Sequence, residues 1–150
     1  MAIQGGLPVS HQAIFPNGAF VVGPVTAIED FDAAKAAREA GIERDVQLRD
    51  KDTGQRMWQV RVIDTDERTR KGQTEVVVKI AADVQPVPPE ALPGLPFRPV
   101  EFVGLVAIAY IDENKAKPRL AWSLRASGMY APGKAPRQGQ PGNGEQGKAA

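Results

Sequence analysis

Five basic residues stand at alternate positions in segments that have the pattern of β-strands. Successive side chains of a strand point to opposite faces of the sheet, so residues between the apolar positions face outward together. Guanidinium and ammonium groups on such a face can bind the phosphates of a polyanion. The chain has a formal net charge of only +1, so a basic face must be local and balanced by acids elsewhere. The expected nucleic-acid-binding residues on strands are Arg49, Arg61, Lys79, Arg119 and Arg125.

Two tyrosines and two flexible basic residues extend this prediction. Tyr110 and Tyr130 lie near expected strand ends, where an aromatic ring can stack on a base. Lys134 and Arg137 belong to a polar C-terminal tail that adds nonspecific phosphate attraction. The only two tryptophans, Trp58 and Trp122, fall on the apolar sides of their strands, so we predict that both are core residues. The alternative is that they form a base-stacking platform.

The sequence contains no recognisable catalytic, metal or cofactor site. His11 is the only histidine and has a serine beside it in sequence, but no glycine-flanked nucleophile follows, so we interpret it as a surface residue. The acidic stretch 64–67 lacks the glycine and distal glutamate of a calcium loop. There is no cysteine, and no glycine-rich loop has the phosphate-binding pattern. We therefore expect a protein that is not an enzyme and carries no cofactor.

The elements that would position these residues are mostly strands. Residues 44–50 and 56–64 predict a hairpin, 73–81 a further strand, and 100–111 with 119–127 a second hairpin. Strand pieces at 19–22 and 25–28 flank Gly23-Pro24. The segment 84–99 holds six prolines, which favours an extended crossover. One short helix is expected over 32–40, between an N-cap at Asp32 and Gly41.

These elements predict an all-β fold: a small OB-like barrel or, second, an antiparallel sandwich, with one short helix. Residues 1–129 would form the β-domain. Residues 130–150 are rich in Gly and Pro without apolar periodicity, so we expect a disordered tail. The sequence begins without a secretory signal pattern, and its longest apolar stretch, 102–111, is about half the ~20 residues of a membrane span. A cytoplasmic protein is expected.

Five segments taken together resemble a known family. The chain is similar to the actinobacterial plasmid replication, integration and excision activators, which are found on plasmids and integrative conjugative elements. The likeness covers about residues 1–129, and no single segment is a chemical signature. It implies a positive regulator of element replication and of site-specific excision and integration, and it supplies no contact residues. The segments are IFPNGAFVVGPV (14–25), RDKDTGQRMWQVRVID (49–64), VVVKIAADVQPVPP (76–89), LPFRPVEFVGL (95–105) and LAWSLRASGM (120–129).

Three functions follow as hypotheses. The first is a non-enzymatic, DNA-associated activator of a mobile element. The second is an OB-type accessory protein of replication that binds single-stranded DNA. The third is a module that recruits the element's own replication or recombination proteins without touching DNA. No helix-turn-helix pattern is present, so DNA contact must come from a β-surface or loops.

Overall fold

The computed structural model describes residues 6–68, 74–114 and 116–136. It is mostly β, with two short helices. The elements in chain order are β1 (Leu7–Pro8), α1 (His11–Ile14), β2 (Ala19–Ala27), α2 (Phe31–Ala40), β3 (Met57–Asp64), β4 (Glu75–Ala81), β5 (Arg98–Val103), β6 (Val106–Asp112), β7 (Arg119–Ala126) and β8 (Gly128–Tyr130).

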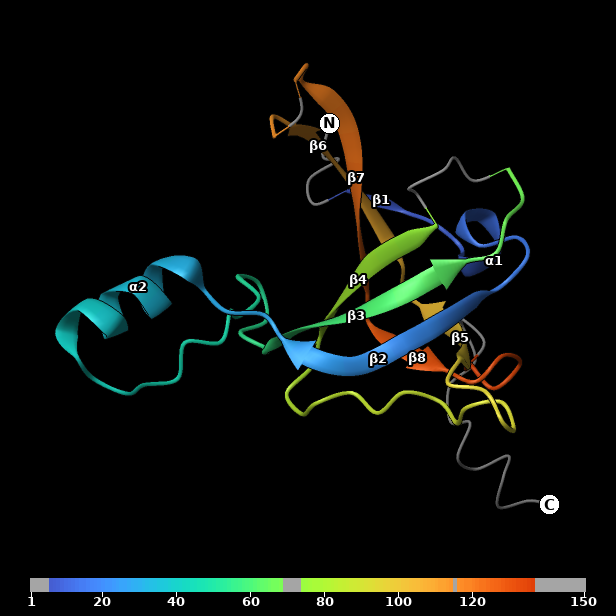
Figure 1. Ribbon diagram of the computed structural model, residues 1–150, viewed down its shortest axis with the longest axis horizontal. Coiled ribbons are helices and arrows are strands. Elements are labelled where there is room, and N and C mark those ends of the chain that lie inside the picture. The colour runs from blue at the N-terminus through green and yellow to red at the C-terminus, as the bar shows by residue number, and fades with distance from the viewer. Residues whose placement is uncertain (1–5, 69–73, 115, 137–150) are drawn as a thin grey trace.

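The strands form one mixed sheet in the order β1-β6-β7-β4-β3-β2-β5-β8. β2, β3 and β4 are consecutive antiparallel neighbours, and β5 returns by a long connection to pair antiparallel with β2. This is the arrangement of a Greek key. The returning connection is the proline-rich segment, which crosses below β2 in Figure 1 without regular structure, as predicted. β7 pairs with β4 in parallel, so the sheet is not purely antiparallel.

A sharp corner at Gly104 curls the sheet into a half-barrel. Only Gly104 and Leu105 separate β5 from β6, although these strands lie near opposite ends of the strand order. The sheet must therefore curl until its two ends approach (Figure 1). Gly104 has φ +62°, and a Cβ there would lie 2.3 Å from Ser127 Oγ. Glycine supplies both the backbone conformation and the space that this corner needs. The predicted single strand 100–111 is thus two strands.

The core lies on the inner face of the curl. Val60, Val62, Val78, Ile80 and Leu124 are buried there, as their alternation predicted. Phe15, Phe102 and Leu105 close the space that these smaller side chains leave. Because the inner positions are mostly β-branched, they pack well on a pleated sheet.

Some local predictions are confirmed, and others differ from the structure in the residues involved. The predicted helix exists as α2, but its N-cap is Asp30, whose carboxylate accepts from two backbone N–H groups, and not Asp32. A second helix, α1, was not predicted. The predicted strand 44–50 is not formed. These residues belong to the long connection between β2 and β3, and they make only two isolated bridges, Glu29↔Gln47 and Arg49↔Arg56.

Two further observations concern the ends of the fold. Tyr130, the first residue of the predicted tail, is the last residue of β8, and most of that tail lies outside the described residues. Within the described part of the chain, no helix has the length and apolar character needed to cross a membrane.

Candidate nucleic-acid interface

Three of the predicted basic residues share the outer face of the sheet. Gln59 on β3 is paired with Lys79 on β4, which is paired in turn with Arg125 on β7. Arg61 lies two residues along β3 from Gln59 and points to the same side. Residues opposite one another in a sheet project from the same face, so Arg61, Lys79 and Arg125 lie on one surface. The alternation in the sequence predicted this placement.

Arg61 is already engaged by a carboxylate on that surface. Its Nε lies 2.6 Å from Glu75 Oε1, and its Nη2 lies 3.1 Å from Oε2. This bidentate pairing raises the pKa of Arg61 and lowers the pKa of Glu75, in both cases chiefly through the side-chain hydrogen bond. Both side chains are more than half exposed, so a phosphate can compete for the guanidinium but must displace Glu75.

Arg125 anchors a loop. Its Nη2 lies 2.6 Å from Oδ1 of Asp50, a carboxylate that is only 8% exposed. The other oxygen, Oδ2, accepts from the Thr53 hydroxyl at 2.7 Å and from the Thr53 backbone N–H at 3.0 Å. The Thr53 hydroxyl and then Arg125 lower the pKa of Asp50 to about 2. The cluster ties the loop 50–55 to the outer face of β7, which the sequence pattern did not reveal.

We predict a specific pH dependence from Asp50. A carboxyl whose folded pKa lies below its unfolded value of about 3.9 stabilises the fold above that value and loses this contribution as pH falls toward 2. The Asp50→Asn variant is therefore expected to be less stable than the wild type at pH 7, and the difference should shrink between about pH 5 and pH 2. Urea unfolding across this range measures it. The other depressed carboxyls are common to both proteins and cancel in the difference, so a gap that stays constant to pH 2 would contradict the assignment.

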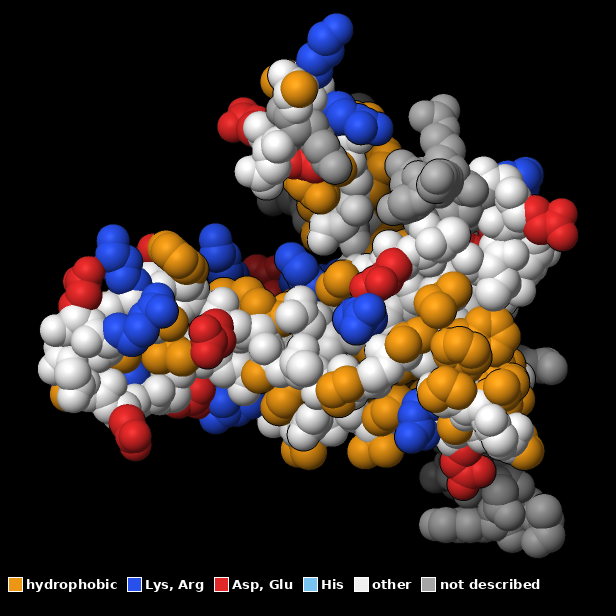
Figure 2. All heavy atoms as spheres, viewed as in Figure 1, with side chains coloured by type: hydrophobic (Ala, Val, Ile, Leu, Met, Phe, Trp, Pro, Cys, Tyr) orange, Lys and Arg blue, Asp and Glu red, His pale blue; other side chains and the backbone are white. Residues whose placement is uncertain are grey.

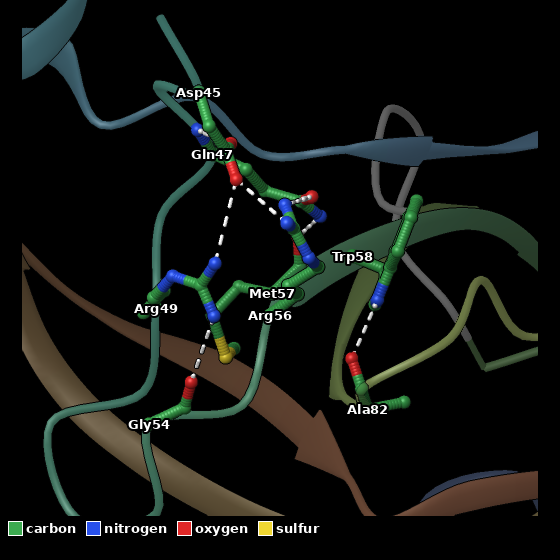
Figure 3. A network of polar contacts seen from close by, with 8 residues as sticks. All are labelled: Asp45, Gln47, Arg49, Gly54, Arg56, Met57, Trp58 and Ala82. Atoms are coloured by element: carbon green, nitrogen blue, oxygen red, sulfur yellow. Dashed lines mark hydrogen bonds and ion pairs between the residues drawn. The ribbon is translucent and has the colours of Figure 1, made fainter.

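Arg49 does not belong to the outer strand surface. Figure 3 shows it in the chain segment before the loop, where its guanidinium contacts Asp45 Oδ2 at 3.4 Å and donates to the Gly54 carbonyl at 3.3 Å. Arg56 reaches the same Asp45 oxygen at 2.6 Å. Hydrogen bonding from Arg56 is the main reason that the pKa of Asp45 is lowered. Arg49 thus lies outside the outer strand surface. It belongs to a polar network with Asp45 and Arg56 in the segment that connects β2 to β3.

Lys79, Arg119 and Tyr110 converge on a groove. The groove has a volume of about 1740 Å³ and lies where β7 separates from the first residues of β4. Neither Lys79 nor Arg119 makes an ion pair within the described residues. Tyr110 is 47% exposed, as expected for a stacking candidate. The apolar residues that line the groove include Leu7, Val9, Ile14, Val76, Val77, Leu120 and Trp122.

The groove exists because β6 and β7 diverge from the first residues of β4. β4 and β7 pair only over Val78–Ile80 and Leu124–Ala126, whereas β6 and β7 remain paired out to Asp112 and Arg119. We call residues 108–114 and 116–123 the arm. It projects at the top of Figure 1, and Figure 2 shows it standing away from the body with basic side chains toward its tip.

The prediction that both tryptophans are core residues holds for Trp58 and is wrong for Trp122. Trp58 is partly buried against the core, and its Nε1 donates to the Ala82 carbonyl at 2.9 Å (Figure 3). Trp122 is 53% exposed and Leu120 is 63% exposed. Both have the inward alternation of β7, but they belong to the arm, where no strand among the described residues covers them. The alternation identified the correct face but not the point at which the core ends.

The remaining predicted residues lie elsewhere. Tyr130 on β8 is 37% exposed and does not line the groove. Lys134 lies in a turn after β8, where its backbone N–H donates to the Ala131 carbonyl. Arg137 lies outside the described residues. The fold therefore does not place Tyr130 or Lys134 in the lining of the groove.

His11 is not the surface residue that we expected. It begins α1, and its Nδ1 accepts from the Phe102 backbone N–H at 3.1 Å. Its ring contacts those of Phe15 and Phe102. Burial lowers its pKa, and Glu101 opposes that effect. This hydrogen bond connects α1 to β5. The imidazole ring must be neutral at Nδ1 to accept it.

The charges that line the groove nearly balance. Lys79, Arg119 and Arg68 are cations, and Asp64, Asp66, Glu75 and Asp112 are carboxylates. Arg68 is bonded to Asp66 at 3.0 Å, and Glu75 is held by Arg61. Lys79 and Arg119, which form no ion pair within the described residues, can each bind a phosphate, but the groove lining carries four carboxylates and three cations. Within the described residues, no group of three or more histidine, aspartate and glutamate side chains is arranged to hold a metal ion.

No protein-family model, curated protein or solved structure matches this chain.

Proposed function

We propose that this chain is a non-enzymatic, DNA-binding accessory protein that acts in the replication, integration and excision of an actinobacterial plasmid or integrative element. The observation that carries the DNA-binding part is the convergence of Lys79, Arg119 and Tyr110 on one groove. These residues come from three different strands, and each supplies chemistry that a nucleic acid needs: two cations for phosphates and one aromatic ring for a base.

The strand order supports an OB-type barrel as the fold behind this function. An OB-fold is a five-stranded, partly open Greek-key barrel. Five strand paths correspond here: β2, β3, β4, the bent unit β5–β6, and β7. OB-folds bind oligonucleotides on the face of their second and third strands, between the loops that join strands 1–2 and 4–5. The equivalents are the outer face of β3 and β4, the loop 50–55 that Asp50 ties to β7, and the tip of the arm.

The mobile-element setting is supported by the resemblance of five segments to the replication, integration and excision activators. Several of these segments contribute to the surfaces described above. RDKDTGQRMWQVRVID contains the Asp50 loop and β3, and LAWSLRASGM contains most of β7 and the start of β8. The segments therefore include the core and part of the groove lining, with Lys79, but Tyr110 and Arg119 lie outside them.

A titration of labelled DNA tests the proposal. Fluorescence anisotropy with a duplex and a single strand of equal length, at about 50 mM salt, should show saturable binding to at least one of them. Because Lys79 and Arg119 form no ion pair within the described residues, two phosphate contacts are expected, and log K should fall with log salt with a slope of about −1.4 for a single strand. Failure to bind either probe would overturn the proposal.

The recruitment function is the competing candidate, and one observation favours it. The groove is lined by more apolar side chains than two phosphate-binding cations need, and such a surface also fits a peptide. The same titration separates the two functions. A protein that binds neither DNA probe but co-purifies stoichiometrically with the element's own initiator or recombinase would be a recruitment module.

A further inference from the structure

One face of the arm is apolar and largely uncovered. In the ladder between β6 and β7, Trp122 is paired with Ala109. Leu120 is paired with Ile111, and all four side chains project from the same face, because residues two apart on a strand share a side. This face continues the inner face of the curl, where the core lies. Trp122, Leu120 and Ile111 are nevertheless 53%, 63% and 57% exposed.

The charged residues of the paired part of the arm lie on its other face. Asp112 and Arg119 are paired with one another, one position beyond Ile111 and Leu120, and therefore project from the outer face. Tyr110 projects from that outer face as well. The paired inner positions carry no charge. Two copies of an uncharged face can meet without bringing like charges together, so a second copy of the chain is a suitable partner for this face.

The arm needs a packing partner because it consists of only two strands. Residues 119–123 of β7 pair with β6 alone among the described residues. An isolated two-stranded hairpin is marginally stable in water, and a further strand or a packed layer on its apolar face stabilises it. Figure 2 shows the arm standing away from the body, and the groove beside it has a volume of about 1740 Å³, so another chain can reach the inner face.

The exposed apolar area is sufficient for a weak dimer. Trp122, Leu120 and Ile111 present roughly 350 Å² of surface, since a tryptophan side chain contributes up to about 250 Å² when fully exposed. Leu7, which lines the same groove and is 44% exposed, adds roughly 80 Å². Two copies would bury roughly 850 Å² from these side chains alone, close to the area of about 1,000 Å² that a biological interface generally needs. A reversible, concentration-dependent dimer is therefore expected.

We propose that two copies of the chain dimerise by packing the inner faces of their arms together about a two-fold axis. Trp122, Leu120 and Ile111 of each copy then form one apolar layer with the same residues of the other, as an isologous interface requires. The two arms lie about 10 Å apart, the usual spacing of packed β-layers. The outer faces remain exposed, so the dimer goes beyond the proposed DNA-binding function and does not depend on it.

Sedimentation velocity of the full chain without DNA tests the dimer. Between about 1 and 200 μM the wild type should change from monomer to dimer, with a dissociation constant on the order of 10 μM. Trp122→Ala and, as a second variant, Leu120→Ser should each raise this constant at least about tenfold. Val84→Ser/Val87→Ser is the matched control, because these side chains are 78% and 82% exposed but lie on the proline-rich crossover. The control should dimerise as the wild type does.

Cross-linking locates the interface. The chain has no cysteine, so a single substitution introduces the only reactive thiol. Ala109→Cys places the thiol opposite Trp122 on the inner face, and a short bismaleimide should link two copies of this variant. Ala91→Cys, at an exposed position on the crossover, should stay unlinked. Circular dichroism and urea unfolding at about 1 μM, where the copies are separate, establish that all variants are folded.

Each contrary result overturns the proposed dimer. A wild type that remains monomeric throughout the concentration range would do so directly. A dimer that both Trp122→Ala and Leu120→Ser leave unchanged, or one that the crossover control weakens equally, would place the contact elsewhere. Dimerisation without cross-linking of Ala109→Cys would show that the inner faces do not meet. None of these results bears on the DNA titration, which measures a different face of the arm.

Discussion

Reversing both groove cations, in Lys79→Glu/Arg119→Glu, is expected to lower the affinity for DNA roughly 100-fold at low salt. Hydrogen bonds to charged groups contribute about 1.5–3 kcal/mol each, and both positions would lose such a bond to phosphate. The variant should keep its fold, because both side chains are exposed and neither forms an ion pair within the described residues. The loss should shrink as salt rises, because counterion release drives these contacts.

The matched control changes the same charges elsewhere. Lys35→Glu/Arg38→Glu alters the net charge identically on α2, whose exposed residues do not line the groove. Its DNA affinity should stay within a few-fold of the wild type. Equal losses in the two double variants would mean that overall charge governs binding, and the groove would no longer be the preferred site. Arg61 is a poorer choice for this test, because reversing it would place a second carboxylate beside Glu75.

Trp58→Ala is expected to reduce the free energy of unfolding by about 3 kcal/mol, because it leaves a cavity beside the core and removes the hydrogen bond to the Ala82 carbonyl. Urea unfolding followed by far-ultraviolet circular dichroism measures the change. Trp122→Ala should alter stability by no more than about 0.5 kcal/mol, as is usual for exposed positions. A loss of several kcal/mol in Trp122→Ala would show that the arm packs against the body and that the groove is closed in solution.

Local rules were sufficient wherever a residue depends only on its neighbours in the chain. The turn at 15–18 is present, with the Gly18 backbone N–H donating to the Phe15 carbonyl and with φ +92° at Gly18. The bulge at Gly23-Pro24, the C-cap at Gly41 and the irregular proline-rich crossover were predicted for the same reason. Alternation along β3, β4 and the second half of β7 also predicted the inner face, because strand geometry has a period of two.

The tertiary structure decided which of the outward basic side chains are available to bind a phosphate, because it brings carboxylates to some of them and not to others. Arg61, Lys79 and Arg125 are equivalent in the sequence, since each alternates with apolar residues on a strand. Residues far away in the chain make them different. Glu75 from β4 engages Arg61, and Asp50 from a loop more than 70 residues earlier engages Arg125. Lys79 has no such partner within the described residues.

The amino-acid sequence by itself determined the β class, the positions of β2, β3, β4 and β7, the crossover and the outward face that carries Arg61, Lys79 and Arg125. Only the tertiary structure decided where that face ends and where the groove begins. β7 diverges from the first residues of β4, and this exposes Trp122 while Trp58 stays against the core. Both tryptophans obey the same local alternation. Burial depends on whether another strand lies opposite, and that is set by strand order and register between segments far apart in the chain.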